Sequence, residues 1–336
     1  MQIMNIQGKK IFVGLSGGVD SAVSAALLKR DGAQVTSVFI KGWYPPGMPC
    51  TWAAERRDAM RVAARLQIPF HTLDAGAEYK KGVIDYLLAE YRVGRTPNPD
   101  VMCNKEVKFG AFFRYAMAQD ADAIAMGHYR AGENNQSYFL WAVPKDVLTG
   151  TLFPVGFFEK REVRVLAKRF NLPVAEKKDS QGICFLGSVS VEEFLRSQFS
   201  ILPGRAVDEN GRVLGEHNSA LLSTIGERVA LKGAHEKGPW FVLVKDVAKN
   251  EIVVGRTRRP SSNFLPQGIP FIAPHWFKEA ASVTEAQYRY RGPHIKGSVK
   301  NDHFVNTDPL PDIPAPGQSI VFYHSGELVG GGIIAS

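Results

Sequence analysis

The sequence predicts an α/β protein with a parallel sheet in its N-terminal part and short β-strands in its C-terminal part. Three observations support this. Over the first 130 residues, β-rich runs alternate with amphipathic helical patterns, as in a parallel sheet covered by helices on both faces. From Leu202, Gly and Pro separate short β-runs, and no convincing helix follows Phe271. At 336 residues the chain is also too long for one core, so two or three domains are expected.

The N-terminal pattern predicts a Rossmann-like order of strands and helices. Strand patterns lie at 11–15, 34–40, 70–73 and 123–126. Helical patterns lie at 19–30, 53–67, 78–91 and 105–119. The first helix has an apolar face and ends at Gly32; the face comprises Val19, Val23, Ala26 and Leu27. Parallel sheets bind ligands at the carboxyl ends of their strands, so functional residues are expected there.

The pattern changes after Gly127. A basic helix is expected near 160–170, with Val163, Leu166, Ala167 and Phe170 facing inward, and a further helix near 191–199. Glu209-Asn210-Gly211 predicts a hairpin. These changes place domain boundaries around a parallel-sheet domain (1–200), a small central β-rich domain (201–266) and a C-terminal barrel or sandwich (267–336).

Composition narrows the class of protein. With 45% hydrophobic and 22% charged residues, the chain reads as an ordinary soluble globular protein. No stretch approaches the roughly 20 apolar residues of a membrane span, and the five-residue run after the N-terminus is too short for a signal segment. A cytoplasmic protein with no membrane partner is expected. The net charge of +8 is weakly in favour of a polyanionic partner.

The strongest local motif lies between the first strand and the first helix, where a phosphate loop is expected. It reads Gly14-Leu15-Ser16-Gly17-Gly18-Val19-Asp20-Ser21. Paired glycines allow a close approach of the backbone, and the N–H groups at a helix start face a phosphate. Because the loop lacks the lysine of a Walker A motif, phosphate is expected to be held by the backbone and by serine hydroxyls. Such a loop suits a departing pyrophosphate.

Three cysteines, Cys50, Cys103 and Cys184, are too few and too uneven for a disulfide framework. Cys103 follows a loop with two prolines and is expected at the N-terminus of the 105–119 helix beside Lys105 and Lys108. That position favours thiolate. Cys184 lies in Asp179–Phe185, after Lys177 and Lys178. Taken alone, each cysteine is more often a buried small hydrophobe than a nucleophile.

These motifs resemble those of a known family. The octapeptide is similar to the PP-loop of the N-type ATP pyrophosphatases, which adenylate a carbonyl oxygen. Together with the cysteines, five segments resemble the bacterial tRNA-specific 2-thiouridylases in order and spacing, from Gly14 to Ile334. They are 96–105, 127–129, 136–140, 179–185 and 316–323.

The resemblance implies a function. The uridine 2-carbonyl oxygen at the tRNA wobble position would be adenylated by ATP with Mg²⁺, and sulfur would then replace it as AMP leaves. Pyrophosphate is released in the first step. Cys184 would carry a persulfide received from a sulfur-relay protein, and Cys103 would be its partner, able to form a disulfide with it. DNA is not expected as a partner, and the C-terminal domain would be a β-barrel that contacts tRNA.

The resemblance also implies binding residues. ATP would be held by the octapeptide with Ile40 and Gly127, and Asp20 is a candidate Mg²⁺ ligand, although the metal ligands stay unassigned. The target base would meet Asn98, Pro99 and Asp100. tRNA would be touched by His128, Asn134, Asn135, Gln136, Arg289, Tyr290 and Gln318. Without the resemblance, His128 would read as a hydrogen-bonded loop histidine.

The chain departs from the family pattern in two places. Only seven residues separate His128 from Gln136, and they end in Asn134-Asn135 where the family has Lys-Asp after a longer hairpin. The segment 225–228 stands where the family usually has Gly-Gln-Arg-Lys-Gly. A lower affinity for tRNA or an altered tRNA preference would follow from these departures.

Three alternatives remain open at the level of sequence. The three cysteines could hold an iron–sulfur cluster that delivers sulfide, although they lie far apart in the chain. The altered segment before Gln136 would also suit a non-catalytic tRNA-binding descendant. A small-molecule synthetase ranks last, because it leaves both cysteines and the basic clusters unexplained.

Overall fold

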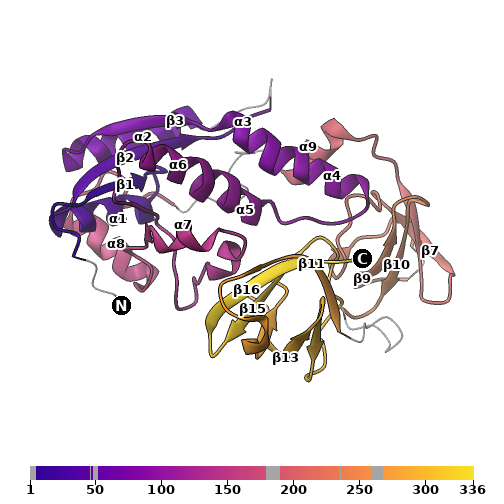
Figure 1. The fold of residues 1–336 in the computed structure, drawn as a ribbon. Coiled ribbons are helices and arrows are strands. Elements are labelled where there is room, and N and C mark those ends of the chain that lie inside the picture. Colours follow the sequence, from indigo (N-terminus) through magenta and orange to yellow (C-terminus); the bar gives the residue numbers. More distant parts are fainter. Residues whose placement is uncertain (1–4, 46, 48–51, 179–189, 235, 259–267) are drawn as a thin grey trace. The chain divides into compact units, whose positions relative to one another are not determined.

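The computed structural model describes residues 5–45, 47, 52–178, 190–234, 236–258 and 268–336 (Figure 1). The chain forms two compact units. The first contains residues 1–84 and 100–190, and the second contains residues 85–99 and 191–336. Within the described ranges, no helix has both the length and the apolar character that crossing a membrane requires.

The first unit contains the predicted parallel sheet. Its strand order is β3-β2-β1-β4-β5, and every neighbouring pair is parallel. The strands are β1 (Lys10–Gly14), β2 (Gln34–Lys41), β3 (Phe70–Asp74), β4 (Ala123–Ala125) and β5 (Thr151–Leu152). The four predicted strands are confirmed to within one residue at each end. The two-residue β5 was not predicted, because it is too short to show periodicity.

Helices cover both faces of this sheet. They include α1 (Val19–Arg30), α2 (Trp52–Leu66), α3 (Gly76–Tyr79), α7 (Lys145–Thr149) and α8 (Lys160–Arg169). Ile11 and Val13 of β1 pack with Ala25 and Leu28 of α1. On the other face, Phe12 and Val38 pack with the helices around Phe109 and Phe112. The Rossmann-like arrangement predicted from sequence is confirmed.

Two predicted helices are each made of several segments. The 78–91 helix is α3 followed by a π-helical segment η1 (Lys80–Asp85) and α4 (Tyr86–Arg92). The 105–119 helix starts earlier, as α5 (Pro99–Met102), the π-helical η2 (Cys103–Ala111) and α6 (Phe112–Met117). A short 3-10 helix, η3 (Ser137–Leu140), follows β4.

Helix α1 is buried on more than the one predicted face. Nine of its twelve residues are buried, including Ser21, Ser24 and Ala25. The expectation of a single apolar face was therefore incomplete: α1 packs on the sheet and also against α2 and α8, through the cluster that contains Ala22 and Val163. Small residues allow this close packing. Gly32 follows the helix at φ +87°, so the predicted stop is confirmed.

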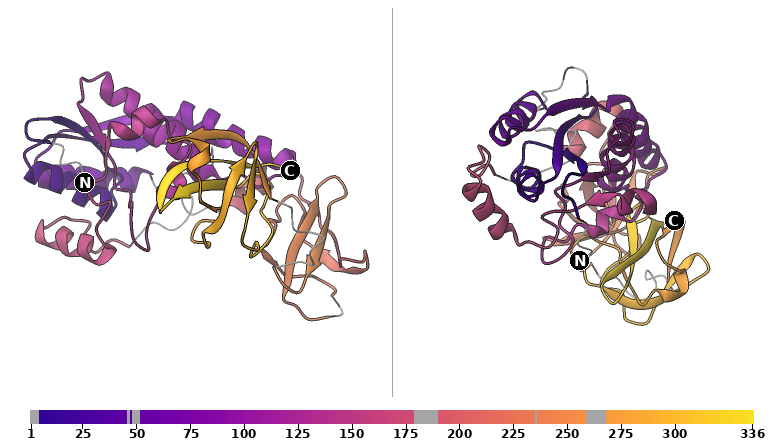
Figure 2. Two further views of the ribbon diagram at one scale, coloured as in Figure 1. Left: turned by 60° about the horizontal axis from the view of Figure 1, so that its bottom comes forward. Right: turned by 60° about the vertical axis from the view of Figure 1, so that its left-hand side comes forward.

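The second unit contains α4, α9 (Val191–Gln198) and two β-structures (Figure 2). The central sheet has the order β7-β6-β10-β9-β8. Its strands are β6 (Gly204–Val207), β7 (Val213–His217), β8 (Arg228–Val229), β9 (Trp240–Asp246) and β10 (Glu251–Gly255). The hairpin predicted between β6 and β7 is confirmed. Gly211 has φ +82°, and Asp208 accepts hydrogen bonds from the N–H groups of Asn210 and Arg212.

The C-terminal strands close into a barrel, as the family resemblance implied, and a sandwich is excluded. The order is β11-β14-β13-β12-β15-β16. The strands are β11 (Ile269–Trp276), β12 (Glu285–Gln287), β13 (Ile295–Lys300), β14 (His303–Asn306), β15 (Ser319–His324) and β16 (Glu327–Ile334), with a 3-10 turn η5 (Ala280–Ser282). Phe271, Phe304 and Phe322 fill its interior. The boundaries at 200 and 266 stay a prediction.

Candidate functional site

The loop between β1 and α1 is closed by its own serines. The Ser16 N–H donates to Ser21 Oγ (3.2 Å), and the two hydroxyl oxygens lie 3.2 Å apart. The Gly18 N–H donates to Ser16 Oγ (3.3 Å), and Ser21 Oγ donates to the Gly18 carbonyl (3.2 Å). These hydrogen bonds hold the loop in shape at the start of a helix, a position where backbone N–H groups favour an anion.

Glycines are required by space as well as by conformation. Gly17 has φ +76°, and a Cβ on it would lie 2.5 Å from the Glu55 carbonyl oxygen. A Cβ on Gly127 would lie 2.9 Å from the Ser21 nitrogen and 3.1 Å from the Asp20 carbonyl carbon. The chain after β4 therefore packs directly on the first turn of α1. This contact brings the predicted nucleotide residue Gly127 to the loop.

Ile40 belongs to the same edge of the sheet. Gly14, the last residue of β1, is paired with Val38 of β2, and Ile40 lies two residues further toward the carboxyl end. Its side chain is partly buried against the cluster that contains Phe109 and Met126. The structure thus places Ile40 on the β2 strand end, the edge where parallel sheets bind ligands.

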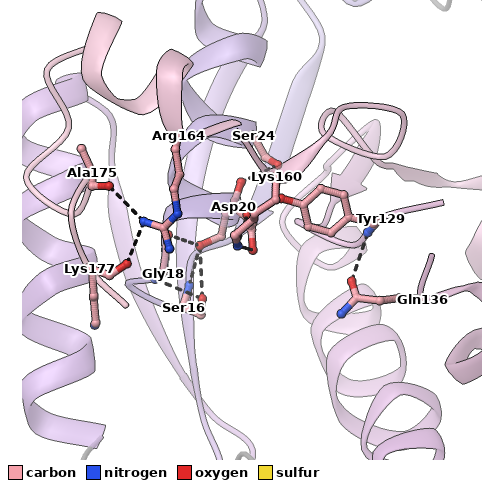
Figure 3. A network of polar contacts seen from close by, with 11 residues as sticks. Ser16, Gly18, Asp20, Ser24, Tyr129, Gln136, Lys160, Arg164, Ala175 and Lys177 are labelled. Carbon is pink, nitrogen blue, oxygen red and sulfur yellow. Dashed lines mark hydrogen bonds and ion pairs between the residues drawn. The ribbon is translucent and has the colours of Figure 1, made fainter. Parts of the chain in front are cut away.

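A lysine from outside the loop lies on its aspartate (Figure 3). Lys160 Nζ, from the first turn of α8, lies 2.8 Å from both carboxylate oxygens of Asp20. The Tyr129 hydroxyl donates to Asp20 Oδ1 at 2.6 Å, and Lys160 also lies 5.7 Å from the centre of the Tyr129 ring. The side chains of Lys160 and Asp20 are 22% and 29% exposed, so this pair is partly shielded from water.

A second lysine contacts the loop backbone. Lys177 Nζ donates to the Gly17 carbonyl (3.0 Å) and to Asp58 Oδ2 of α2 (2.7 Å). Arg164 of α8 holds this region through the Lys177 and Ala175 carbonyls, at 3.1 and 3.3 Å (Figure 3). The two lysines are 140 and 160 residues away from their loop partners in the chain.

Sequence reasoning missed the roles of these two lysines. The sequence places Lys160 in the basic helix near 160–170 and Lys177 just before the Cys184 segment, and it predicts a loop that holds phosphate without a lysine. Two ammonium groups lie beside the loop in the structure, and how the loop holds phosphate stays a prediction. The signal in the sequence is weak, because Lys160 and Lys177 lie 140 and 160 residues from the loop residues that they contact.

The donor set at the loop fits a Mg²⁺ ion that arrives with a nucleotide. Mg²⁺ is usually bound through one or two carboxylates together with substrate phosphates and waters, and Asp20 supplies one carboxylate within the loop. Among the residues that the structure describes, no cluster of three or more His, Cys, Asp or Glu side chains could hold a metal. Both oxygens of the Asp20 carboxylate contact Lys160 in this structure, and the assignment of Asp20 as a Mg²⁺ ligand stays a prediction.

Cys103 lies within a helix and not at its start. The helical segment begins at Pro99, so Cys103 is one turn inside it, at the first residue of η2, and it is 3% exposed. The predicted activation at a helix N-terminus is therefore wrong, since that effect is confined to the first turn. Cys50 and Cys184 lie outside the described residues.

His128 is a neutral histidine in aromatic surroundings. Its ring lies 5.4 Å from the Phe109 ring and 6.3 Å from the Phe153 ring, measured between centroids. Burial, together with the charges of Lys108 and Arg130, lowers the pKa of His128 to about 3. Near pH 7 this side chain therefore carries no charge with which to attract a phosphate.

Hydrogen bonds join the two ends of the short segment between Tyr129 and Gln136. Gln136 Oε1 accepts from the Tyr129 N–H (3.1 Å), and the Gln136 N–H donates to the Tyr129 carbonyl (2.9 Å). Asn135 Oδ1 accepts from the Ser137 N–H (2.9 Å), while Asn134 is half-exposed. The same Tyr129 donates to Asp20, so this segment is tied to the phosphate loop through one tyrosine.

The remaining predicted tRNA and base residues fall in different surroundings. Burial raises the pKa of Asp100, in the first turn of α5.

Arg289 Nη2 donates to the Ile225 and Ile313 carbonyls at 3.0 and 3.2 Å, and its Nε lies 2.8 Å from Asp312. The Arg291 guanidinium lies 5.3 Å from the centre of the half-buried Tyr290 ring. The Arg289 side chain thus has protein partners on several donors.

Gln318 has protein partners as well. Its side-chain nitrogen donates to the Thr96 and Pro97 carbonyls at 2.8 and 3.1 Å. Thr96 and Pro97 precede Asn98 and Pro99, two of the three predicted base contacts, and these four residues belong to the second unit, whereas Asp100 belongs to the first. Contact of Arg289, Tyr290 or Gln318 with tRNA stays a prediction.

Comparisons with known proteins cover nearly the whole chain. Residues 9–188, 192–256 and 267–334 match family models described as "tRNA methyl transferase HUP domain", "tRNA methyl transferase PRC-barrel domain" and "Aminomethyltransferase beta-barrel domain".

Curated relatives carry a different name. The chain is 40% identical over 355 residues to the tRNA-specific 2-thiouridylase MnmA of Streptococcus thermophilus, covering 97% of this chain and 95% of that protein. It is 40% identical over 354 residues to the protein of the same name from Streptococcus sanguinis, with the same coverage. A solved structure of a 4-thiouridine synthetase–RNA complex with bound ATP is 22% identical, with a TM-score of 0.37; the match covers 56% of this chain and 50% of that one.

Proposed function

This chain belongs to the tRNA-specific 2-thiouridylase family, and from that premise we propose that it makes 2-thiouridine at the wobble position of tRNA. The reaction consumes ATP and has two steps. The uridine 2-carbonyl oxygen first attacks the α-phosphate of ATP and displaces pyrophosphate. Sulfur then attacks C2, and AMP leaves with the original oxygen. A carbonyl oxygen is a poor leaving group, and adenylation makes it a good one.

The first step is supported by the loop between β1 and α1. Its backbone N–H groups and the Ser16 and Ser21 hydroxyls suit the departing pyrophosphate, because they lie at a helix start. Lys160 and Lys177 add positive charge beside that position. Mg²⁺ held by Asp20 would neutralise part of the triphosphate charge. This convergence of a preformed loop and two distant lysines is the observation that carries the proposal.

The second step is assigned to the two cysteines. Cys184 would carry a persulfide delivered by a sulfur-relay protein. Its terminal sulfur would bond to C2 as AMP departs, leaving the base joined to Cys184 through two sulfurs. The Cys103 thiolate would then attack the Cys184 sulfur, form a disulfide and release the base as the thiocarbonyl. A thiol reductant would restore both cysteines. Asn98, Pro99 and Asp100 would hold the target base, and the barrel would contact the tRNA.

The proposal is tested by incubating the purified protein with ATP, Mg²⁺, a persulfide donor and unmodified tRNA, and then measuring 2-thiouridine by mass after digestion. Cys103→Ser and Cys184→Ser should abolish product, and Cys50→Ser should retain it. Pyrophosphate release in the presence of tRNA should survive in both inactive variants, because adenylation precedes sulfur transfer.

Other outcomes would refute the assignment. Wild-type activity in both Cys103→Ser and Cys184→Ser would rule out the two-cysteine mechanism. An iron-dependent absorbance band that disappears in all three cysteine variants would favour cluster-delivered sulfide. Normal tRNA binding without pyrophosphate release or product would show a binding protein without catalytic function.

A further inference from the structure

The segment that precedes the proposed base contacts has no regular secondary structure, yet it is tightly held. Thr96 is 7% exposed, and each of its polar atoms has a hydrogen-bond partner. Its N–H donates to the Pro316 carbonyl (2.9 Å), its carbonyl accepts from Gln318 Nε2 (2.8 Å), and its hydroxyl accepts from Lys245 Nζ (3.1 Å). A loop residue with this many partners has little freedom to move.

The partners come from two different β-structures of the second unit. Lys245 lies on β9 of the central sheet, whereas Pro316 and Gln318 form the turn that leads into β15 of the barrel. That turn is itself anchored, because the Gly317 N–H donates to the Ile334 carbonyl (2.9 Å) and the Ile334 N–H donates to the Gln318 carbonyl (2.8 Å). Thr96 is therefore fixed with respect to both structures.

The barrel turn requires a glycine for this approach. Gly317 has φ +90°, and a Cβ on it would lie 2.9 Å from the Thr96 carbonyl oxygen and from Arg95 Cβ. The preceding residue is held from the other side, since Arg95 pairs with Glu90 of α4 at 2.5 Å. The segment is thus in contact with a helix, a sheet and a barrel within three residues.

Burying the charged side chain of Lys245 costs desolvation free energy that a purely structural contact would not require. Burial lowers its pKa to about 8, although the nearby Glu227 acts in the opposite direction. Its ammonium also donates to the Ser223 carbonyl (2.9 Å). An apolar side chain of similar length would pack without the cost of desolvating a charge. A role in fixing Thr96 accounts for the presence of a lysine.

We infer that Lys245, Gln318 and the Pro316–Gly317 turn form a clamp on Thr96 and Pro97 that positions the target-base segment. The three are positioning residues, which act through Thr96 and Pro97 and not by touching the base. The inference rests on the proposed function, because Asn98 and Pro99 directly follow the clamped residues. It gives Gln318 a role that differs from the predicted contact with tRNA.

The test uses the full-length protein and three variants, Lys245→Met, Gln318→Ala and Thr96→Val, with Lys249→Met as the control. Lys249 lies in the turn between β9 and β10 and has a 71% exposed side chain. Lys245→Met and Gln318→Ala should lower kcat by about 10- to 100-fold, the effect of a small misplacement near a reaction centre. The Kd for tRNA should stay within about twofold, because both side chains are held by protein groups and, on this inference, make no contact with RNA. Lys249→Met should change neither quantity.

A double-mutant comparison isolates the clamp. Lys245→Met should cost much less in the Thr96→Val background than in the wild type, because the valine has already removed the hydroxyl acceptor. Hydrogen exchange of the peptide around residues 94–103 should be faster in Lys245→Met and in Thr96→Val than in the wild type. Lys245→Arg, which keeps the charge, should retain part of the kcat that Lys245→Met loses. Additive effects of the two substitutions, or unchanged exchange, would overturn the inference.

Two further outcomes separate the alternatives. A loss of tRNA affinity in Gln318→Ala with unchanged kcat would mean that Gln318 binds tRNA directly and that the clamp is wrong. If the wild type makes no 2-thiouridine, the proposed function fails. The clamp is then judged by the exchange measurement alone, which needs no activity.

Discussion

Replacing Gly17 by alanine would cost stability in two ways, through a left-handed backbone and through a steric contact. Two other glycines allow each cost to be measured alone. Gly8 has φ +75° and nothing within 4 Å of an added Cβ, so Gly8→Ala tests only the left-handed backbone. Gly127 lacks a positive φ, but its Cβ would lie 2.9 Å from the Ser21 nitrogen, so Gly127→Ala tests only the contact. Gly17 has φ +76° and a Cβ position 2.5 Å from the Glu55 carbonyl oxygen.

The magnitudes follow from these distances. A left-handed alanine costs about 1–2 kcal/mol of stability. A methyl group forced into packed surroundings costs about 1–3 kcal/mol, and the contact at Gly127 is with backbone atoms, which cannot rotate away. Gly17→Ala should therefore destabilise the first unit by about 2–5 kcal/mol, the sum of the two effects.

The assay measures stability and ligand binding separately. Hydrogen exchange of the slowest amides in β1 and β2 reports the opening free energy of the first unit in each variant. ATP binding is measured by equilibrium dialysis below the unfolding range. Gly127→Ala and Gly17→Ala should both weaken ATP binding, since both displace the start of α1, whereas Gly8→Ala should leave it unchanged.

Two results would refute this reasoning. If Gly17→Ala costs no more stability than Gly8→Ala, the Glu55 contact carries no energy. If Gly127→Ala keeps full ATP affinity while losing stability, the first turn of α1 is not part of the nucleotide site.

Three further predictions concern charge. Lys160→Met should lower the stability of the first unit by about 1–3 kcal/mol, a value between those for exposed and buried ion pairs, and it should raise the KM for ATP. Lys168→Met, at a lysine whose side chain is 62% exposed, is the matched control for both measurements. Burial lowers the pKa of His128 from 6.5 to about 3. Its contribution to stability is therefore complete above about pH 6.5 and is lost as the pH falls toward 3, because over this range only the unfolded chain binds the proton. In acid-unfolding measurements His128→Asn should flatten this part of the plot of stability against pH, and an unchanged plot would contradict the lowered pKa. Arg289→Met should destabilise the second unit by about 3–5 kcal/mol, because it leaves the Asp312 carboxylate (9% exposed) without its ion pair. Arg291→Met is the control. Equal decreases in the thermal unfolding temperature for the two variants would count against a structural role for Arg289.

The fold was predictable because it depends on local patterns. The β-rich runs at β1 to β4 are bounded by turns and helices, and periodicity reports burial directly. The hairpin at Gly211 and the phosphate loop depend on residues adjacent in sequence, so both could be found there. The strand β5 spans two residues and leaves no periodicity to detect.

The start of the helix that carries Cys103 was misplaced for a physical reason. Two prolines in the segment before it indicated a stiff loop, but proline is favoured at the first position of a helix, where its missing N–H is not needed. Pro99 occupies that position, followed by Asp100 in the first turn. The acidic residue directly after a proline was the available signal, and it moves Cys103 from the helix start to the interior.

The partners of long polar side chains could not be predicted. Arg289 and Gln318 were assigned to tRNA because charge and motif position are visible in sequence, whereas carbonyl groups that accept their hydrogen bonds are not. Gln318 and Thr96 are 222 residues apart, and only the closed barrel brings them together. Burial of a polar side chain indicates that it has a partner, but it does not indicate which one.

The two lysines at the phosphate loop show why distant residues suit this site. A lysine next to a half-buried loop would be a costly unpaired cation whenever no phosphate is bound. Here Lys160 is paired with Asp20 and Lys177 with Asp58, so each ammonium has a carboxylate partner without a ligand. A bound triphosphate would offer both lysines a new anionic partner, and the net affinity would be the difference between the two pairings. On the proposed function, the loop motif would specify where phosphate binds, and the strength of binding would depend on two carboxylates, Asp20 within the motif and Asp58 outside it.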